Sequence, residues 1–280
     1  MNPRPHLESF GVALKERLRR IGARLLNQPV AAYELRAPND MARLYRHLRK
    51  GDVVLVEGEL RISQFVKYAT QSQWSHCALY VGDELLRRGG ALREQALAKF
   101  GELADRVIVE ALTEEGVIAA PLAKYRGLNI RICRPSSIDP ADLDGVLDSV
   151  LADLGKRYDK RNFLDLALML LSPVKFGPLK ARTIHTCLGN CTDLEVMCSG
   201  MIAKAFHGVG YPILPQVDRG DNDPSRLTLR MQHYSQIVPR DFDLSPYFQI
   251  IKFNVVEEGA FDYRRLTRKQ AAAEPIGLRR

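Results

Sequence analysis

The chain has 280 residues, 46% of them hydrophobic and 26% charged, and carries a formal net charge of +8 at pH 7. This composition is typical of a soluble globular protein and excludes a mainly disordered chain. The length allows one large domain or two small ones, with a core that needs no disulfide staples. The basic runs at 15–24 and 263–270 are not interleaved with aromatic residues, so we expect no specific nucleic-acid binding.

The N-terminal region lacks the continuous apolar core of a secretory signal. No window reaches the roughly 18 apolar residues of a membrane-spanning helix. Five cysteines form no regular framework, and we expect them to be reduced. These features predict a cytoplasmic protein.

Apolar residues recur at helical spacing over 7–27, which predicts an amphipathic helix with basic residues mostly off its apolar stripe. We expect the stripe to pack on the domain or on a partner; the alternative is peripheral contact with an anionic membrane. A linker over 27–40 follows. A short helix over 41–50 comes next, with Asn39 or Asp40 as its N-cap and Gly51 as its end.

Beyond residue 50 the pattern alternates between short strands and helices, without regular βαβ repetition. The sequence predicts strands at 51–58, 75–83, 106–112, 116–122, 128–135 and 247–257. It predicts helices at 61–71, 139–154, 163–171 and 196–210, a charged insertion with a helical centre at 84–105, and a proline-rich loop after 210. This order indicates an α+β fold.

Cys198 lies near the start of the helix predicted over 196–210. Unpaired backbone N–H groups and the positive end of the helix dipole favour a thiolate there. The small residues Ser199 and Gly200 leave room for a carbonyl substrate. Cys198 is therefore a candidate nucleophile.

A nucleophilic thiol also needs a base within hydrogen-bonding reach. Of the six histidines, His76 is the best placed, because it stands at the edge of the strand SHCALYVGD. The alternative interpretation is a buried structural histidine and a small buried cysteine. Cys77 should point to the opposite face of the strand from His76, and Cys133 should lie in the core.

The order of these pieces resembles a known family. The runs are GDVVLVEG, ISQFVKYATQSQWSHCALYVGD, VIVEAL, GKRYDKRNF and MCSGMIAKAF. Together they are similar to the circularly permuted branch of the NlpC-type papain-like cysteine hydrolases, the YiiX/YebB-like proteins, which are related to the lecithin–retinol acyltransferase group. In this branch the histidine strand precedes the cysteine helix, as it does here. The resemblance covers roughly residues 50–255.

The resemblance implies that Cys198 is the nucleophile, His76 the general base, and Glu110 a carboxylate that orients the imidazole or contacts substrate. It also implies that Tyr158 lies near the substrate pocket. The family often has Cys-Ser-Glu at the nucleophile, whereas this chain has Gly200 at the third position. This departure bears on substrate recognition more than on the nucleophile.

A rival site lies just before the predicted nucleophile. His185, Cys187, Cys191 and Cys198 are residue types that bind zinc, and four such ligands would close a tetrahedral site. The run lacks a Cys-x-x-Cys pair, so we expect an irregular loop beside the active site instead, with neither a metal nor a cofactor.

The sequence thus predicts an α+β, permuted papain-like fold in which a small antiparallel sheet packs on the nucleophile-bearing helix. We expect N-terminal helices and a linker over 1–49, the hydrolase domain over 50–258, and a basic tail over 259–280. The resemblance implies a cysteine hydrolase for amide or ester bonds, with cell-wall stem peptides or their fragments as candidate substrates. The alternatives are a lipid acyl hydrolase or acyltransferase, and a non-catalytic module that binds lipid or wall fragments.

Overall fold

A computed structural model describes residues 28–29, 33–35, 39–112, 115–156, 196–220 and 223–251. Its strands are β1 (Val53–Val56), β2 (His76–Gly82), β3 (Val107–Leu112), β4 (Gly116–Pro121), β5 (Ile130–Pro135), β6 (Gln216–Gly220), β7 (Asp223–Arg230) and β8 (Phe248–Ile251). Its α-helices are α2 (Met41–His47), α3 (Arg61–Thr70), α4 (Glu84–Arg88), α5 (Gly90–Phe100), α6 (Pro140–Ala152), α8 (Met201–Gly208) and α9 (Pro239–Leu244).

Shorter helical segments complete these elements. Three are 3₁₀ turns: η1 (Gly101–Leu103), η2 (Leu122–Tyr125) and η5 (Tyr234–Gln236). The fourth, η4 (Val196–Gly200), is a π-helical turn that leads directly into α8.

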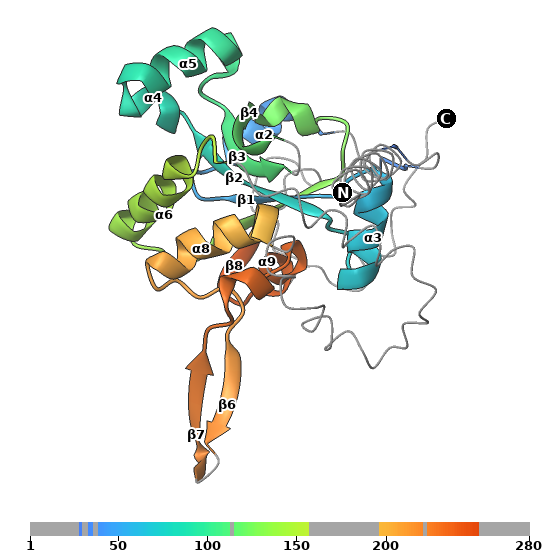
Figure 1. The fold of residues 1–280 in the computed structure, drawn as a ribbon, viewed down its shortest axis with the longest axis vertical. Coiled ribbons are helices and arrows are strands. Elements are labelled where there is room, and N and C mark those ends of the chain that lie inside the picture. Colours follow the sequence, from blue (N-terminus) through green and yellow to red (C-terminus); the bar gives the residue numbers. More distant parts are fainter. Residues whose placement is uncertain are drawn as a thin grey trace, which may run out of the picture.

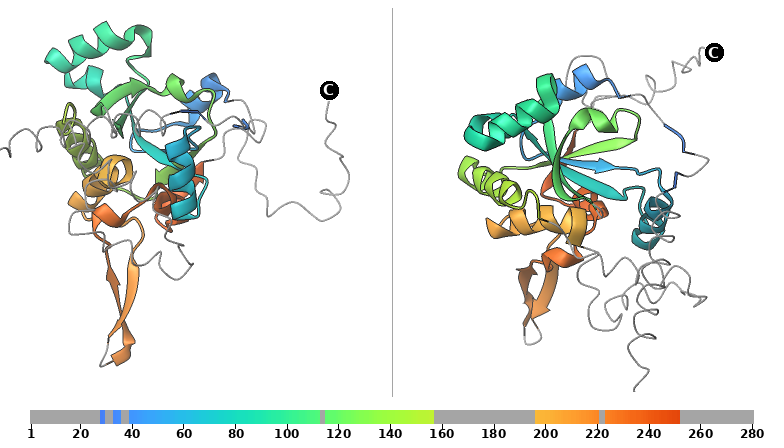
Figure 2. Two further views of the ribbon diagram at one scale, coloured as in Figure 1. Left: turned by 45° about the vertical axis from the view of Figure 1, so that its right-hand side comes forward. Right: turned by 45° about the horizontal axis from the view of Figure 1, so that its top comes forward.

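Six strands form one antiparallel sheet in the order β4-β3-β2-β1-β5-β8. Helices α6 and α8 pack against each other beside this sheet, and the β6–β7 hairpin projects away from the body (Figures 1 and 2). The architecture is α+β, as the sequence predicts.

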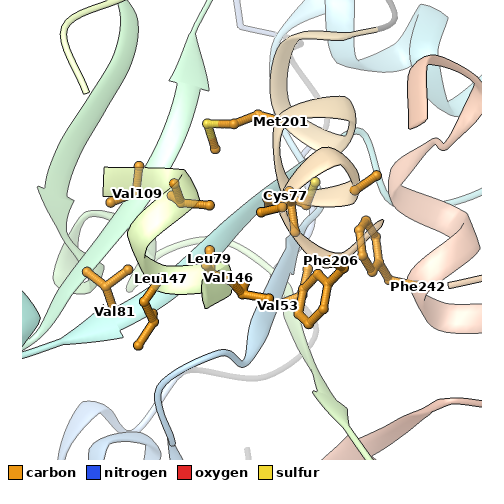
Figure 3. Close-up of a cluster of buried hydrophobic side chains, with 14 of the residues drawn as sticks. Val53, Cys77, Leu79, Val81, Val109, Val146, Leu147, Met201, Phe206 and Phe242 are labelled. Carbon is orange, nitrogen blue, oxygen red and sulfur yellow. The ribbon is translucent and has the colours of Figure 1, made fainter. Parts of the chain in front are cut away.

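Alternation along the strands divides the core between the two faces of the sheet. On one face, side chains of β1, β2 and β3 meet those of α6, α8 and α9 (Figure 3). On the other, residues of α2 and η2 pack over Val54, Ala78, Tyr80 and Ile108. Cys77 belongs to the first cluster and Ala78 to the second, which confirms the predicted alternation. Cys133 is fully buried, also as expected.

The main departures follow residue 210, where the sequence indicates only a proline-rich loop. The structure has the β6–β7 hairpin, the turn η5 and the short helix α9 there. Helix α9 begins at Pro239, whose fixed φ suits a first helical position, and Asp241 accepts from the backbone N–H of Val238 at 2.9 Å. At six residues it is too short to show helical periodicity in the sequence.

Helix starts also follow the predicted local chemistry. The side chain of Asp40 accepts from the backbone N–H of Arg43 at 3.0 Å and caps α2. That helix ends at His47 rather than at Gly51, and Gly51 turns the chain into β1 with a φ of +86°. In α6, Asp139 is the N-cap residue and Pro140 is the first helical residue, although the Asp139 side chain makes no capping bond.

Several predicted features lie outside the described residues: the amphipathic helix over 7–27, the helix over 163–171, Tyr158, His185, Cys187, Cys191 and the tail over 259–280. In the part of the chain that the structure describes, no helix is long and apolar enough to cross a membrane. The division of the chain at residues 49 and 258 stays a prediction.

Candidate active site

Strand β2 positions His76 at its first residue, beside the end of β1. Val56 pairs with His76, and the backbone N–H of Ser75 donates to the Val56 carbonyl at 3.1 Å. The hydroxyl of Ser75 accepts from the backbone N–H of Gly58 at 2.9 Å. The start of β2 is thus held through Ser75, the residue before the histidine, and the His76 side chain is 19% exposed.

Strand β3 carries Glu110 to the same face of the sheet as His76. The antiparallel register pairs Leu79 with Val109, so Glu110 and His76 are diagonal neighbours on one face. His76 Nε2 lies 2.8 Å from Glu110 Oε2, and the carboxylate is fully buried. This ion pair links two residues that stand 34 positions apart.

The turn η2 adds two further groups to this carboxylate. Pro121 ends β4, and in the tight turn that follows, Leu122 and Tyr125 lie on one side and are buried. The Tyr125 hydroxyl donates to Glu110 Oε2, and the Lys124 ammonium donates to Glu110 Oε1. Neither residue belongs to a sequence motif, and their contact with Glu110 depends on how β3 and β4 pair.

The turn η4 brings Cys198 to the start of β2. This turn packs against β2, β3 and η5, and Ser199 anchors it by donating to the carbonyl of Ile237 at 2.6 Å. The Cys198 sulfur lies beside the His76 ring and Cys77, and both groups act on its pKa. Because Glu110 occupies Nε2 of His76, the other ring nitrogen, Nδ1, is left for the sulfur.

These neighbours shift the titration of the cysteine. The hydrogen bond from Cys77 and the charge and hydrogen bond of His76 outweigh burial and hold the pKa of Cys198 well below its usual 9.0. Burial, and then the adjacent Cys198, raises the pKa of Cys77 well above 9.0, so Cys77 keeps its proton and acts as a donor. The surroundings of Cys198 therefore favour the thiolate over the thiol.

His76 and Glu110, the other two ionisable groups of this series, are charged as well. Burial opposes the imidazolium, but Cys198 and then Glu110 outweigh it and raise the pKa of His76 from 6.5 to about 10. Burial would raise the pKa of Glu110, but His76 and then Lys124 lower it from 4.5 to about 2. Burial and the charge of Glu110 raise the pKa of Tyr125 well above 10.0, so its hydroxyl stays a donor.

The structure thus brings together three of the four predicted site residues, Cys198, His76 and Glu110, and places Cys77, Lys124 and Tyr125 beside them. Tyr158 lies outside the described residues. So do three of the four candidate zinc ligands, and within the described ranges no group of three His, Cys, Asp or Glu side chains is arranged to hold a metal ion. A thiolate beside an imidazolium that is fixed by a carboxylate is suited to nucleophilic attack on a carbonyl.

Comparison with known families gives a match over the part of the chain that holds β1 to β5. The family model of permuted papain-like amidases, YaeF/YiiX, C92 family, matches residues 47–165. The match contains His76 and Glu110 and ends before Cys198, which reaches the site through the fold. No curated protein matches the chain. Over residues 47–165 the chain is therefore similar to the YaeF/YiiX family of permuted papain-like amidases.

Proposed function

We propose that the protein is a cysteine amidase whose nucleophile is Cys198, with His76 as its acid–base partner and Glu110 as the carboxylate that orients the imidazole. The observation that carries this proposal is the His76–Glu110 pair, 2.8 Å apart with its carboxylate fully buried, beside Cys198, whose pKa His76 lowers. A structural cysteine would have no need of a charged histidine or of a buried anion behind it.

The chemistry follows from the charges. The Cys198 thiolate attacks the amide carbonyl, forming a carbon–sulfur bond and an oxyanion that nearby backbone N–H groups can stabilise. The carbon–nitrogen bond then breaks as the His76 imidazolium gives its proton to the departing amine. Neutral His76 next takes a proton from water, which attacks the thioester, and the acid product leaves with the thiolate restored.

Glu110 keeps its charge throughout this cycle. Its carboxylate accepts from His76, Lys124 and Tyr125 together, so it holds the ring in one orientation and stabilises the imidazolium. The substrates that best fit the family and the site are small peptide amides, among them stem peptides of the cell wall or their fragments.

Alkylation by iodoacetamide tests the nucleophile without a known substrate. We expect Cys198 to react at least about tenfold faster than Cys133 at pH 7, since a thiolate reacts and a buried thiol does not. Peptide mass spectrometry of briefly treated native protein gives the site of labelling. Equal labelling of the two cysteines would remove the basis of the proposal.

Activity is tested with the p-nitroanilide and the p-nitrophenyl ester of the same N-acetylated amino acid. Cys198→Ala should abolish hydrolysis of both while leaving the circular dichroism spectrum and the unfolding midpoint near those of the parent chain. Cys133→Ala is the matched control, because it removes a buried thiol of the same sheet outside the site. Hydrolysis that survives in Cys198→Ala would contradict the assignment.

A further inference from the structure

The carboxylate of Glu110 uses its two oxygens for different partners. Oε2 faces His76 at 2.8 Å and accepts from Tyr125, whereas Oε1 accepts from the Lys124 ammonium. Glu110 is fully buried, but the side chain of Lys124 is 34% exposed. The positive charge of Lys124 therefore reaches the interior of the site from the solvent side.

The groups of the site form a series of alternating charge. Thiolate, imidazolium, carboxylate and ammonium follow one another from Cys198 through His76 and Glu110 to Lys124. Among the described residues, the other titratable groups that act on this cluster include the neutral donors Cys77 on β2 and Tyr125 on η2. With Lys124 in place the four charges sum to zero. Without it, the cluster would carry a net negative charge around the buried Glu110.

This balance bears on the proton that catalysis must move. An imidazolium that is held too strongly by an anion is a poor acid for a departing amine. Lys124 also pairs with Glu110, and its positive charge offsets part of the effect of the carboxylate on His76. We infer that Lys124 is a positioning residue of the site, acting through Glu110 to keep His76 able to release its proton to the leaving group. This inference rests on the proposed amidase function and deepens it.

The test compares two leaving groups in Lys124→Met. A p-nitroanilide needs a proton from His76 as it departs, whereas a p-nitrophenolate leaves without one. We expect kcat/KM for the anilide to fall about tenfold and that for the ester by less than about twofold, since general acid catalysis contributes only where the leaving group needs a proton. The His76 ring, titrated by NMR, should show its midpoint raised by about half a unit, because the partly exposed charge of Lys124 acts through partly screened electrostatics.

Two further variants separate charge from hydrogen bonding. Lys124→Arg keeps both and should restore the anilide-to-ester ratio. Lys124→Gln keeps a donor to Glu110 without the charge and should behave like Lys124→Met, and it serves as the neutral variant if the methionine protein does not fold. Lys50→Met is the matched control, because Lys50 pairs with the buried Glu84 outside the site and its loss should leave the ratio unchanged.

An unchanged ratio in both neutral variants, or an equal loss on the two substrates, overturns the role of Lys124. If Cys198→Ala is inactive in the same assays, the amidase proposal survives that result. If Cys198→Ala retains activity, the amidase proposal itself fails. The two failures are therefore distinguishable.

Discussion

Cys77 shows how one side chain serves both the core and the site. It points away from the face that carries His76, is fully buried, and packs in the cluster below α8. It nevertheless lowers the pKa of Cys198, because η4 lies against β2. Strand alternation predicts the face of Cys77 but says nothing of what packs on that face, so the contact could not be read from the sequence.

Replacing Cys77 should change the acidity of the nucleophile. Cys77→Ala removes a donor to the thiolate, and we expect the pKa of Cys198 to rise by about one unit, since a hydrogen bond to a charged group contributes about 1.5 kcal/mol. The rate of iodoacetamide alkylation measured against pH gives this pKa. Cys77→Ser keeps an O–H donor and should restore most of the shift. Equal pH profiles for the alanine variant and the parent chain would show that the Cys77 thiol contributes only to packing and not to the pKa of Cys198.

At the scale of elements, α9 helps to fix the segment that leads into β2. The Trp74 indole N–H donates to Asp243 at 3.0 Å, and Arg131 of β5 donates to the same carboxylate at 2.6 Å. The Arg131 guanidinium also lies over the Trp74 ring, 5.0 Å from its centroid. Trp74 stands two residues before His76, so this cluster connects α9 to the strand that begins with His76.

Asp243→Ala should therefore destabilise the protein. The Trp74 indole N–H and the Arg131 guanidinium both lose their acceptor at a partly buried position. We expect the free energy of unfolding to fall by about 2 kcal/mol. Urea denaturation followed by tryptophan fluorescence measures the change, since Trp74 is the sole tryptophan of the chain. Asp148→Ala provides the control: its ion pair with Arg88 is exposed, and its loss should cost less than about 0.5 kcal/mol. Equal effects from both substitutions would argue against the anchoring role.

On the scale of the whole molecule, the sequence predicts the elements better than their contacts. Runs such as VVLV and VIVEAL read as strands because both faces of the sheet are covered, and the structure has β1 and β3 there. The β6–β7 hairpin escapes prediction because its strand QVDRG lacks the β-branched alternation that marks the others. The strand order is set by long-range pairing, which local patterns do not encode.

The same limit applies to the site. His76 and Cys198 stand out by residue type and by their places at the ends of elements, and Glu110 by the family resemblance. Lys124 and Tyr125 have no such signal, since their role depends on a turn after β4 that folds back over β3. The sheet order β4-β3-β2 is what assembles these parts of the chain.

The buried charge of Glu110 should also make the stability of the whole fold depend on pH. Its pKa is about 2 in the folded protein and about 4.5 when exposed, so its contribution is complete above pH 4.5 and is lost as the pH falls toward 2. The pKa of His76, about 10, keeps the imidazolium charged across this window. Glu110→Gln should lower the free energy of unfolding by about 3 kcal/mol at pH 6, as expected when one partner of a buried ion pair is removed. Between pH 4.5 and pH 2.5 the gap between the two proteins should close progressively in urea denaturation, because the parent chain loses what the variant already lacks. A gap that stays constant over this range would mean that Glu110 is not the ionised partner of His76.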